Sequence, residues 1–137
     1  MTKHSLYLCG GINGLTDDEC MNWRAFAKAR SRAKGIMCVD PMRRDYRGNE
    51  DDHSVEIVEN DKLDIDRCQA VLVNATRPSW GTAMEVIYAY EHGKMVVAFT
   101  GESPVSPWLT YHTNQTVRSL ESATLFCLNH LETLESP

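Results

Sequence analysis

Residues 70–93, AVLVNATRPSWGTAMEVIYAYEHG, join a strand pattern directly to a helix pattern. Residues 70–75 form a short apolar run that is typical of a buried strand. Residues 81–92 have helical spacing, and Gly93 ends the pattern. Ligands of an open α/β sheet bind just beyond the carboxyl ends of its strands. Glu85, placed in the first turn of this helix, is therefore a candidate functional carboxylate, which a helix N-terminus would keep ionised.

The same alternation of strand and helix runs through the whole chain. Thr16 is a good N-cap and Glu19 completes a capping box, so a helix is expected from Thr16 to about residue 33. Segments 40–52 and 101–114 are polar or rich in Ser and Pro, and we expect them to be irregular. Strands are expected at 5–9, 36–39, 70–75, 95–99 and 116–118, and the other helices at 54–67, 81–92 and 120–134.

This alternation predicts a single-domain α/β fold with a parallel sheet and helices on both faces. The natural closure is a doubly wound, five-stranded, flavodoxin-like sheet of order 2-1-3-4-5. Its switch point lies between the first and third strands. The loops at residues 10–14 and 76–81 would then flank one crevice, with Glu85 pointing into it.

Composition narrows the function classes. The chain has 137 residues, enough for one domain with a sizeable core, and a net charge of -5. That charge argues against nucleic acid as a partner. No apolar run approaches the length of a membrane span, and residues 1–4 lead into only a short apolar run, so we expect neither a membrane span nor a signal peptide. The five cysteines, an odd number without a C-x-x-C pair, favour reduced thiols and the cytoplasm.

Glu85 and Asp61 are the two carboxylates that carry the strongest chemical hypothesis. Glu85 could simply be a helix residue satisfied by backbone N–H groups, and Asp61 could lie on a wet helix face with Asp64 and Asp66, which we expect to be solvated. A pair of carboxylates would be functional if the enzyme reacts at the anomeric carbon of a sugar. One acid then attacks the carbon and the other assists the leaving group.

Two loops could complete a binding site. Residues 40–48 contain three arginines and Tyr46, and they form either a solvated turn or a lid that stacks on a base and brings positive charge to a phosphate. The glycines at 10, 11 and 14 allow close backbone approach to a ligand but do not fit a dinucleotide-binding motif. The histidines are scattered without metal-ligand spacing, so we assign neither a metal nor a cofactor.

Three blocks in order resemble the nucleoside 2-deoxyribosyltransferase superfamily. They are YLCGGI at 7–12, END at 59–61 before CQAVLV at 68–73, and PSWGTAME at 78–85. The resemblance covers most of the chain and implies one such domain over residues 1–137. The superfamily contains base-exchanging transferases, 2'-deoxynucleoside 5'-phosphate N-hydrolases and a ribonucleotide N-glycosidase.

The resemblance implies a role for each matching residue. Glu85 falls on the nucleophile, Asp61 on the aspartate that works beside it, and Tyr7 on a strand tyrosine near the nucleophile. The implied reaction is retaining: Glu85 attacks C1', the base leaves with help from Asp61, and water or a second base then captures the sugar.

Ser79 bears on the substrate. It stands where the monophosphate hydrolases have a phosphate-binding serine and base-exchanging transferases have an aspartate. Gly11 stands where the hydrolases have another such serine. Ser106, with Ser103 as an alternative, is the nearest match to a serine that a neighbouring subunit donates, so a homodimer or larger homo-oligomer is implied. The residues expected to bind substrate are Gly10, Gly11, Ile12, Asn13, Arg43, Arg44, Tyr46, Ser79, Trp80, Gly81, Met84 and Ser106.

Three hypotheses follow. The first is an N-glycosidase of nucleoside 5'-monophosphates, acting through a glycosyl ester on Glu85. The second is a deoxyribosyltransferase that exchanges bases between deoxynucleosides. The third is a non-enzymatic nucleotide-sensing domain, because fold does not determine function. The choice between purine and pyrimidine, and between ribose and deoxyribose, stays open.

Overall fold

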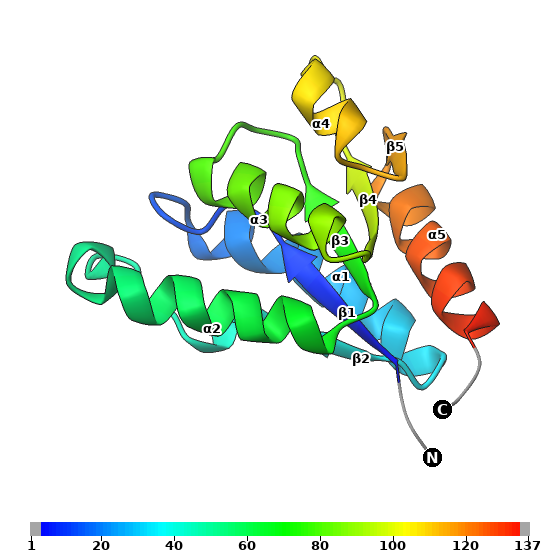
Figure 1. Cartoon of the computed structure of the whole chain (residues 1–137), viewed down its shortest axis with the longest axis horizontal. Coiled ribbons are helices and arrows are strands. Elements are labelled where there is room, and N and C mark those ends of the chain that lie inside the picture. The colour runs from blue at the N-terminus through cyan, green and yellow to red at the C-terminus, as the bar shows by residue number, and fades with distance from the viewer. Residues whose placement is uncertain (1–3, 135–137) are drawn as a thin grey trace.

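The computed structural model describes residues 4–134 and shows one α/β domain (Figure 1). A five-stranded sheet is flanked by helices on both faces. The elements are, in chain order, β1 (Ser5–Cys9), α1 (Asp17–Ala33), β2 (Met37–Val39), η1 (Pro41–Arg43), η2 (Glu50–His53), α2 (Ser54–Arg67), β3 (Ala70–Asn74), α3 (Trp80–Glu91), β4 (Met95–Phe99), α4 (Pro107–Tyr111), β5 (Gln115–Val117) and α5 (Leu120–Thr133).

The sheet has the order β2-β1-β3-β4-β5 and every neighbouring pair is parallel. In the centre, Leu8 of β1 lies opposite Leu72 of β3, which lies opposite Val97 of β4. This confirms the predicted order and places the switch point between β1 and β3. The carboxyl ends of these two strands therefore open onto one crevice.

The core has two layers because successive side chains of a strand point to opposite faces. Leu6 and Leu8 of β1 pack in the cluster that contains residues of α1 and α5. Tyr7 and Cys9 of the same strand pack in the cluster that contains residues of α2 and α3. The helices α2 and α3 lie side by side over that second face (Figure 1). Tyr7 is thus buried directly under the helices that carry Asp61 and Glu85.

Most element boundaries agree with the sequence patterns to within one residue. The capping box of Thr16 and Glu19 is present at the start of α1, and Gly35 follows the end of this helix with a φ of 70°. The two segments expected to be irregular hold short helices. Residues 40–52 contain η1 and η2, while α4 begins where the Ser106 hydroxyl caps the helix and Pro107 fits its first turn.

No helix within residues 4–134 is long and apolar enough to cross a membrane. The expectation that the chain has no signal peptide was based partly on residues 1–3, and these lie outside the described residues. All five cysteines fall within the described part of the chain, and none of them forms a disulfide there.

Candidate active site

A pocket of about 180 Å³ lies at the switch point. The loops that follow β1, β2 and β3 contribute to its wall together with α2 and α3, as the sheet topology requires. Its lining residues are Gly10, Ile12, Asn13, Pro41, Arg44, Tyr46, Arg47, Glu50, Ile57, Asp61, Ser79, Gly81, Thr82 and Glu85. The expectation of one crevice between the loops after the first and third strands is confirmed.

Glu85 is a partly buried carboxylate that lines this pocket. It is the sixth residue of α3, in the second turn and beyond the free N–H groups of the helix start, so the expected first-turn position is wrong. Burial and, to a lesser extent, the negative charge of Asp61 together raise the pKa of Glu85 to about 8. The expectation that the helix N-terminus keeps Glu85 ionised is therefore also wrong.

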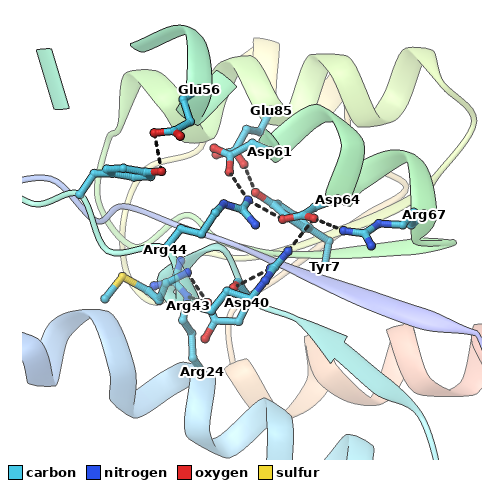
Figure 2. Close-up of polar contacts among 12 residues, drawn as sticks. Tyr7, Arg24, Asp40, Arg43, Arg44, Glu56, Asp61, Asp64, Arg67 and Glu85 are labelled. Carbon is cyan, nitrogen blue, oxygen red and sulfur yellow. Dashed lines mark hydrogen bonds and ion pairs between the residues drawn. The ribbon is translucent and has the colours of Figure 1, made fainter. Parts of the chain in front are cut away.

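Tyr7 is the residue that holds Glu85 in place. Its hydroxyl donates a hydrogen bond to Glu85 Oε2 (Figure 2). The Tyr7 side chain is fully buried in the sheet, and burial raises the pKa of its hydroxyl, so it is a rigid neutral donor. This bond lowers the pKa of Glu85 and opposes the effect of burial. Tyr7 thus orients the carboxylate and favours its ionised form.

Asp61, on α2, is the second carboxylate of the pocket. Burial raises its pKa to about 6, although the guanidinium of Arg44, 3.4 Å away at Asp61 Oδ1, lowers it. Asp61 and Glu85 line the same pocket from the neighbouring helices α2 and α3, and the charge of Asp61 acts on Glu85 (Figure 2). Between roughly pH 6 and pH 8, such a pair holds one proton. One member can then act as a nucleophile and the other as an acid.

Asp64 is buried, not solvated as expected from the sequence. Its side chain is only 1% exposed, and it accepts hydrogen bonds from Arg43 at 2.8 Å, from Arg44 at 2.6 Å and from Arg67. These bonds lower the pKa of Asp64 against the effect of burial. A buried carboxylate is stable only when it is paired in this way. Asp66 is exposed, as expected, and accepts a hydrogen bond from Tyr88.

The arginines of the loop after β2 have different roles. Arg44 lines the pocket, and within residues 4–134 only its Nη2 atom has hydrogen-bond partners. Arg47 also lines the pocket, but its guanidinium is taken up by Asp17, Asp45 and the carbonyl of Leu15. Of the two arginines in the pocket wall, Arg44 is therefore the one with unused donors for a ligand.

Arg24 supports the pocket from beneath. Its buried guanidinium donates to the carbonyls of Gly10 and Cys20 and forms an ion pair with Asp40 at 3.1 Å. Gly10 itself has no room for a side chain, because a Cβ there would lie 2.7 Å from the Trp23 ring. The backbone of the loop after β1 is thus held close to the pocket by a side chain and by packing.

The N-terminus of α3 forms another part of the wall. Ser79 caps the helix, with its hydroxyl 3.4 Å from the Thr82 nitrogen, and it lines the pocket together with Gly81 and Thr82. A Cβ on Gly81 would meet nothing within 4 Å, so the space beside it is open. A helix N-terminus with a hydroxyl and open space is suited to an anion.

Five of the expected substrate-binding residues do not line the pocket. Arg43 turns to Asp64 and the Asp40 carbonyl. Gly11 lies behind Ser79 and borders a separate hollow. Trp80 and Met84 are 86% and 64% exposed on α3. Ser106 caps α4 away from the pocket. The others, Gly10, Ile12, Asn13, Arg44, Tyr46, Ser79 and Gly81, do line it.

Sequence reasoning missed five residues of the wall: Pro41, Arg47, Glu50, Ile57 and Thr82. Thr82 had an available signal, because it lies three positions before Glu85 and therefore on the same helix face. Its hydroxyl is buried and has no hydrogen-bond partner among residues 4–134. Glu50 and Ile57 had no such signal, since they reach the pocket only through the folding of the loop and α2.

Comparisons with known proteins identify a family for this chain. The family model for nucleoside 2-deoxyribosyltransferase matches residues 6–122. No curated protein sequence matches the chain significantly.

Several solved structures share the fold. A 2-deoxyribosyltransferase from Leishmania mexicana superposes with a TM-score of 0.70 at 20% identity, over 93% of this chain and 98% of that one. A 2-deoxyribosyltransferase from Bacillus psychrosaccharolyticus gives 0.73 at 15%, over 93% and 95%. A CMP N-glycosidase from Clostridium botulinum gives 0.54 at 16%, over 93% and 98%. The family match covers most of the chain, including every residue that lines the pocket. This chain therefore belongs to the nucleoside 2-deoxyribosyltransferase family and is an enzyme that acts on N-glycosidic bonds.

Proposed function

We propose that this enzyme hydrolyses the N-glycosidic bond of a nucleoside 5'-monophosphate through a covalent sugar ester on Glu85. The observation that carries the proposal is the Tyr7–Glu85 hydrogen bond at a pocket shared with Asp61. Glu85 attacks C1' as the bond to the base breaks, and the electron pair of that bond leaves with the base. Asp61 supplies a proton to the base. Water then attacks C1' and gives its proton to the Asp61 carboxylate, which releases the sugar phosphate and restores both carboxyl groups to their starting forms.

Other groups of the pocket wall support a phosphate in the substrate. The Ser79 hydroxyl and the start of α3 face the same pocket as Glu85, and the unused donors of Arg44 lie in its wall. Together these groups supply a hydroxyl, a helix N-terminus and a guanidinium to an anion. The base would occupy the remaining part of the pocket, which includes Tyr46 and Ile57.

The alternative is base exchange between unphosphorylated deoxynucleosides. One observation favours it: Arg43 and Arg47 are already neutralised by carboxylates, so the arginine loop offers less positive charge than its composition indicates. Both alternatives use Glu85, Asp61 and Tyr7 in the same roles. They differ in the 5'-substituent of the substrate and in what captures the sugar. The non-enzymatic alternative is discarded, because the chain belongs to an enzyme family.

A substrate panel separates the two reactions. Nucleosides and their 5'-monophosphates, with ribose or deoxyribose, are incubated with the enzyme, and free base is measured by chromatography with and without a second base. We expect base release from monophosphates without an acceptor. Turnover of deoxynucleosides that requires the acceptor would contradict hydrolysis. Glu85→Gln should abolish either reaction, and Glu91→Gln, an exposed change on the same helix, is the matched control.

Ser79→Ala tests the phosphate contact directly. We expect a rise in KM of roughly tenfold for monophosphates and little change for nucleosides, which corresponds to the loss of one hydrogen bond to a charged group. The loss of the cap costs about 1 kcal/mol of stability, so folding is checked by circular dichroism. An equal effect on both substrate classes would mean that Ser79 does not contact a phosphate.

We also propose that the enzyme works as a homo-oligomer in which Ser106 reaches the pocket of a neighbouring copy. Within one chain Ser106 is exposed and outside the pocket, and α4 next to it exposes Trp108 and Tyr111 by 72% and 70%. Sedimentation equilibrium measures the assembly. Mixing Ser106→Ala with Glu85→Gln should restore activity if each copy completes the other's site. A fully active Ser106→Ala monomer would contradict this.

A further inference from the structure

The buried carboxylate of Asp64 has no place in the mechanism above, yet it lies directly beside it. Asp64 does not line the pocket, and its side chain is 1% exposed on α2. It is nonetheless the partner of Arg44, the guanidinium that contacts Asp61. Figure 2 shows the Arg44 side chain between the two aspartates. A salt bridge of this kind needs a reason, because replacing one with apolar groups often costs no stability.

The two contacts of Arg44 are unequal. Its Nη2 atom lies 2.6 Å from Asp64 Oδ2 and 3.4 Å from Asp61 Oδ1. The first is a short charge-assisted hydrogen bond, whereas the second is at the outer limit of hydrogen bonding. Asp64 therefore takes the main interaction of a cation that would otherwise pair with Asp61.

This competition matters because a full ion pair would keep Asp61 ionised. An aspartate bound tightly by an arginine holds its charge and cannot donate a proton. Resting on the function proposed above, we propose that Asp64 is a positioning residue that holds Arg44 back from Asp61 and so keeps Asp61 able to donate a proton to the leaving base.

Other charges also face Asp61, and they set the background for this effect. Arg43 and Arg44 approach from the loop after β2 and lower its pKa, whereas the charge of Asp64 raises it. The charged or titratable groups around Asp61 are Arg43, Arg44, Asp64, Tyr7 on β1 and Glu85 on α3. Removing the charge of Asp64 therefore acts twice in one direction: it frees Arg44 for Asp61 and removes a repulsive charge.

The test is a ¹³C NMR titration of the aspartate carboxyl carbons, with the Asp61 signal assigned by its loss in Asp61→Asn. In Asp64→Asn we expect the Asp61 titration to move to lower pH by roughly one unit. In Arg44→Met we expect it to move to higher pH. Asp66→Asn, an exposed change on the same helix, should leave it in place. Shifts in opposite directions are not what a purely structural role produces.

Two further measurements separate the possible outcomes. If Asp64→Asn does not fold, the double variant Asp64→Asn/Arg67→Met keeps the net charge of the cluster and carries the same expectation. In Asp64→Asn, the acidic limb of the pH profile of kcat/KM should move to lower pH by the same amount as the Asp61 NMR titration. An Asp61 titration that stays in place or moves to higher pH in Asp64→Asn overturns the positioning role. The NMR result does not depend on turnover, so it stands even if the substrate panel contradicts the proposed reaction.

Discussion

The pH dependence of catalysis is the sharpest test of the Glu85–Asp61 pair. A nucleophilic Glu85 has to be ionised, and an Asp61 that assists the base has to be protonated. Burial raises the pKa of Glu85 to about 8 and the pKa of Asp61 to about 6. The pair carries a single proton between these values, so we expect a bell-shaped profile of kcat/KM with limbs near pH 6 and pH 8.

The same two values give the size of the effect. The proton prefers Glu85 over Asp61 by about two pKa units, or ~2.7 kcal/mol at 1.36 kcal/mol per unit. The productive arrangement is then about one part in a hundred of the singly protonated pair. Asp61→Asn removes the proton donor and lowers the pKa of Glu85, because the charge of Asp61 raises it. The variant should lose roughly 10²- to 10⁴-fold in rate, and its rate should rise with pH and then level off.

The assay is kcat/KM from base release between pH 5 and pH 9.5 at constant ionic strength. A substrate phosphate also titrates near pH 6, and that contribution persists in Asp61→Asn, whereas the limbs that belong to the carboxylate pair do not. Asp66→Asn should keep the wild-type bell. The reasoning is refuted if the alkaline limb survives in Asp61→Asn, or if the wild-type profile is flat from pH 6 to pH 9.

Three further changes test the surroundings of the nucleophile. Tyr7→Phe removes the donor to Glu85, so kcat/KM should fall roughly ten- to hundredfold and the alkaline limb should move to higher pH; an unmoved limb contradicts the orienting role. Glu85→Gln should stabilise the fold at pH 9, by at most ~5 kcal/mol in urea unfolding, because the folded state binds the Glu85 proton more tightly than the unfolded chain does and ionisation above pH 8 is costly. At pH 5 Glu85 is protonated in the folded state, so the gain should shrink to about 1 kcal/mol or less, and an equal gain at both pH values points to a cause other than ionisation. Gly10→Ala places a Cβ 2.7 Å from Trp23 and should lower the free energy of unfolding by about 1–3 kcal/mol, whereas Gly81→Ala, with open space at its Cβ, should not.

The fold could be predicted closely because its signals are local. A capping box at Thr16, a stop at Gly35 and apolar runs of strand length each depend on residues near one another in the chain. The short helix α4 is the clearest omission. Its start signal, Ser106 before Pro107, was present, but a helix of five residues has too little periodicity to be recognised in a polar segment.

The candidate site could be predicted in part. Glu85 follows from its place after a strand near the switch point, whereas Asp61 and Ser79 follow from the resemblance to the family, and the structure brings all three to one pocket. Trp80 and Met84 were wrongly expected beside them. They are neighbours of Ser79 and Glu85 in the chain, but the turn of the helix carries their side chains to the exposed face.

The sequence alone determined the order of strands and helices and the family of the enzyme, because both depend on local patterns and on motifs in a set order. Only the tertiary structure decided the protonation of the site. Tyr7 and Glu85 are 78 positions apart in the chain. Asp64 accepts hydrogen bonds from Arg43 and Arg44, which lie 21 and 20 positions away. The sequence expectation was a helix terminus that ionises Glu85 and an Asp64 in solvent. Folding instead buries Asp64 fully and Glu85 in part, and burial together with distant partners sets their charge. No local pattern contains that information.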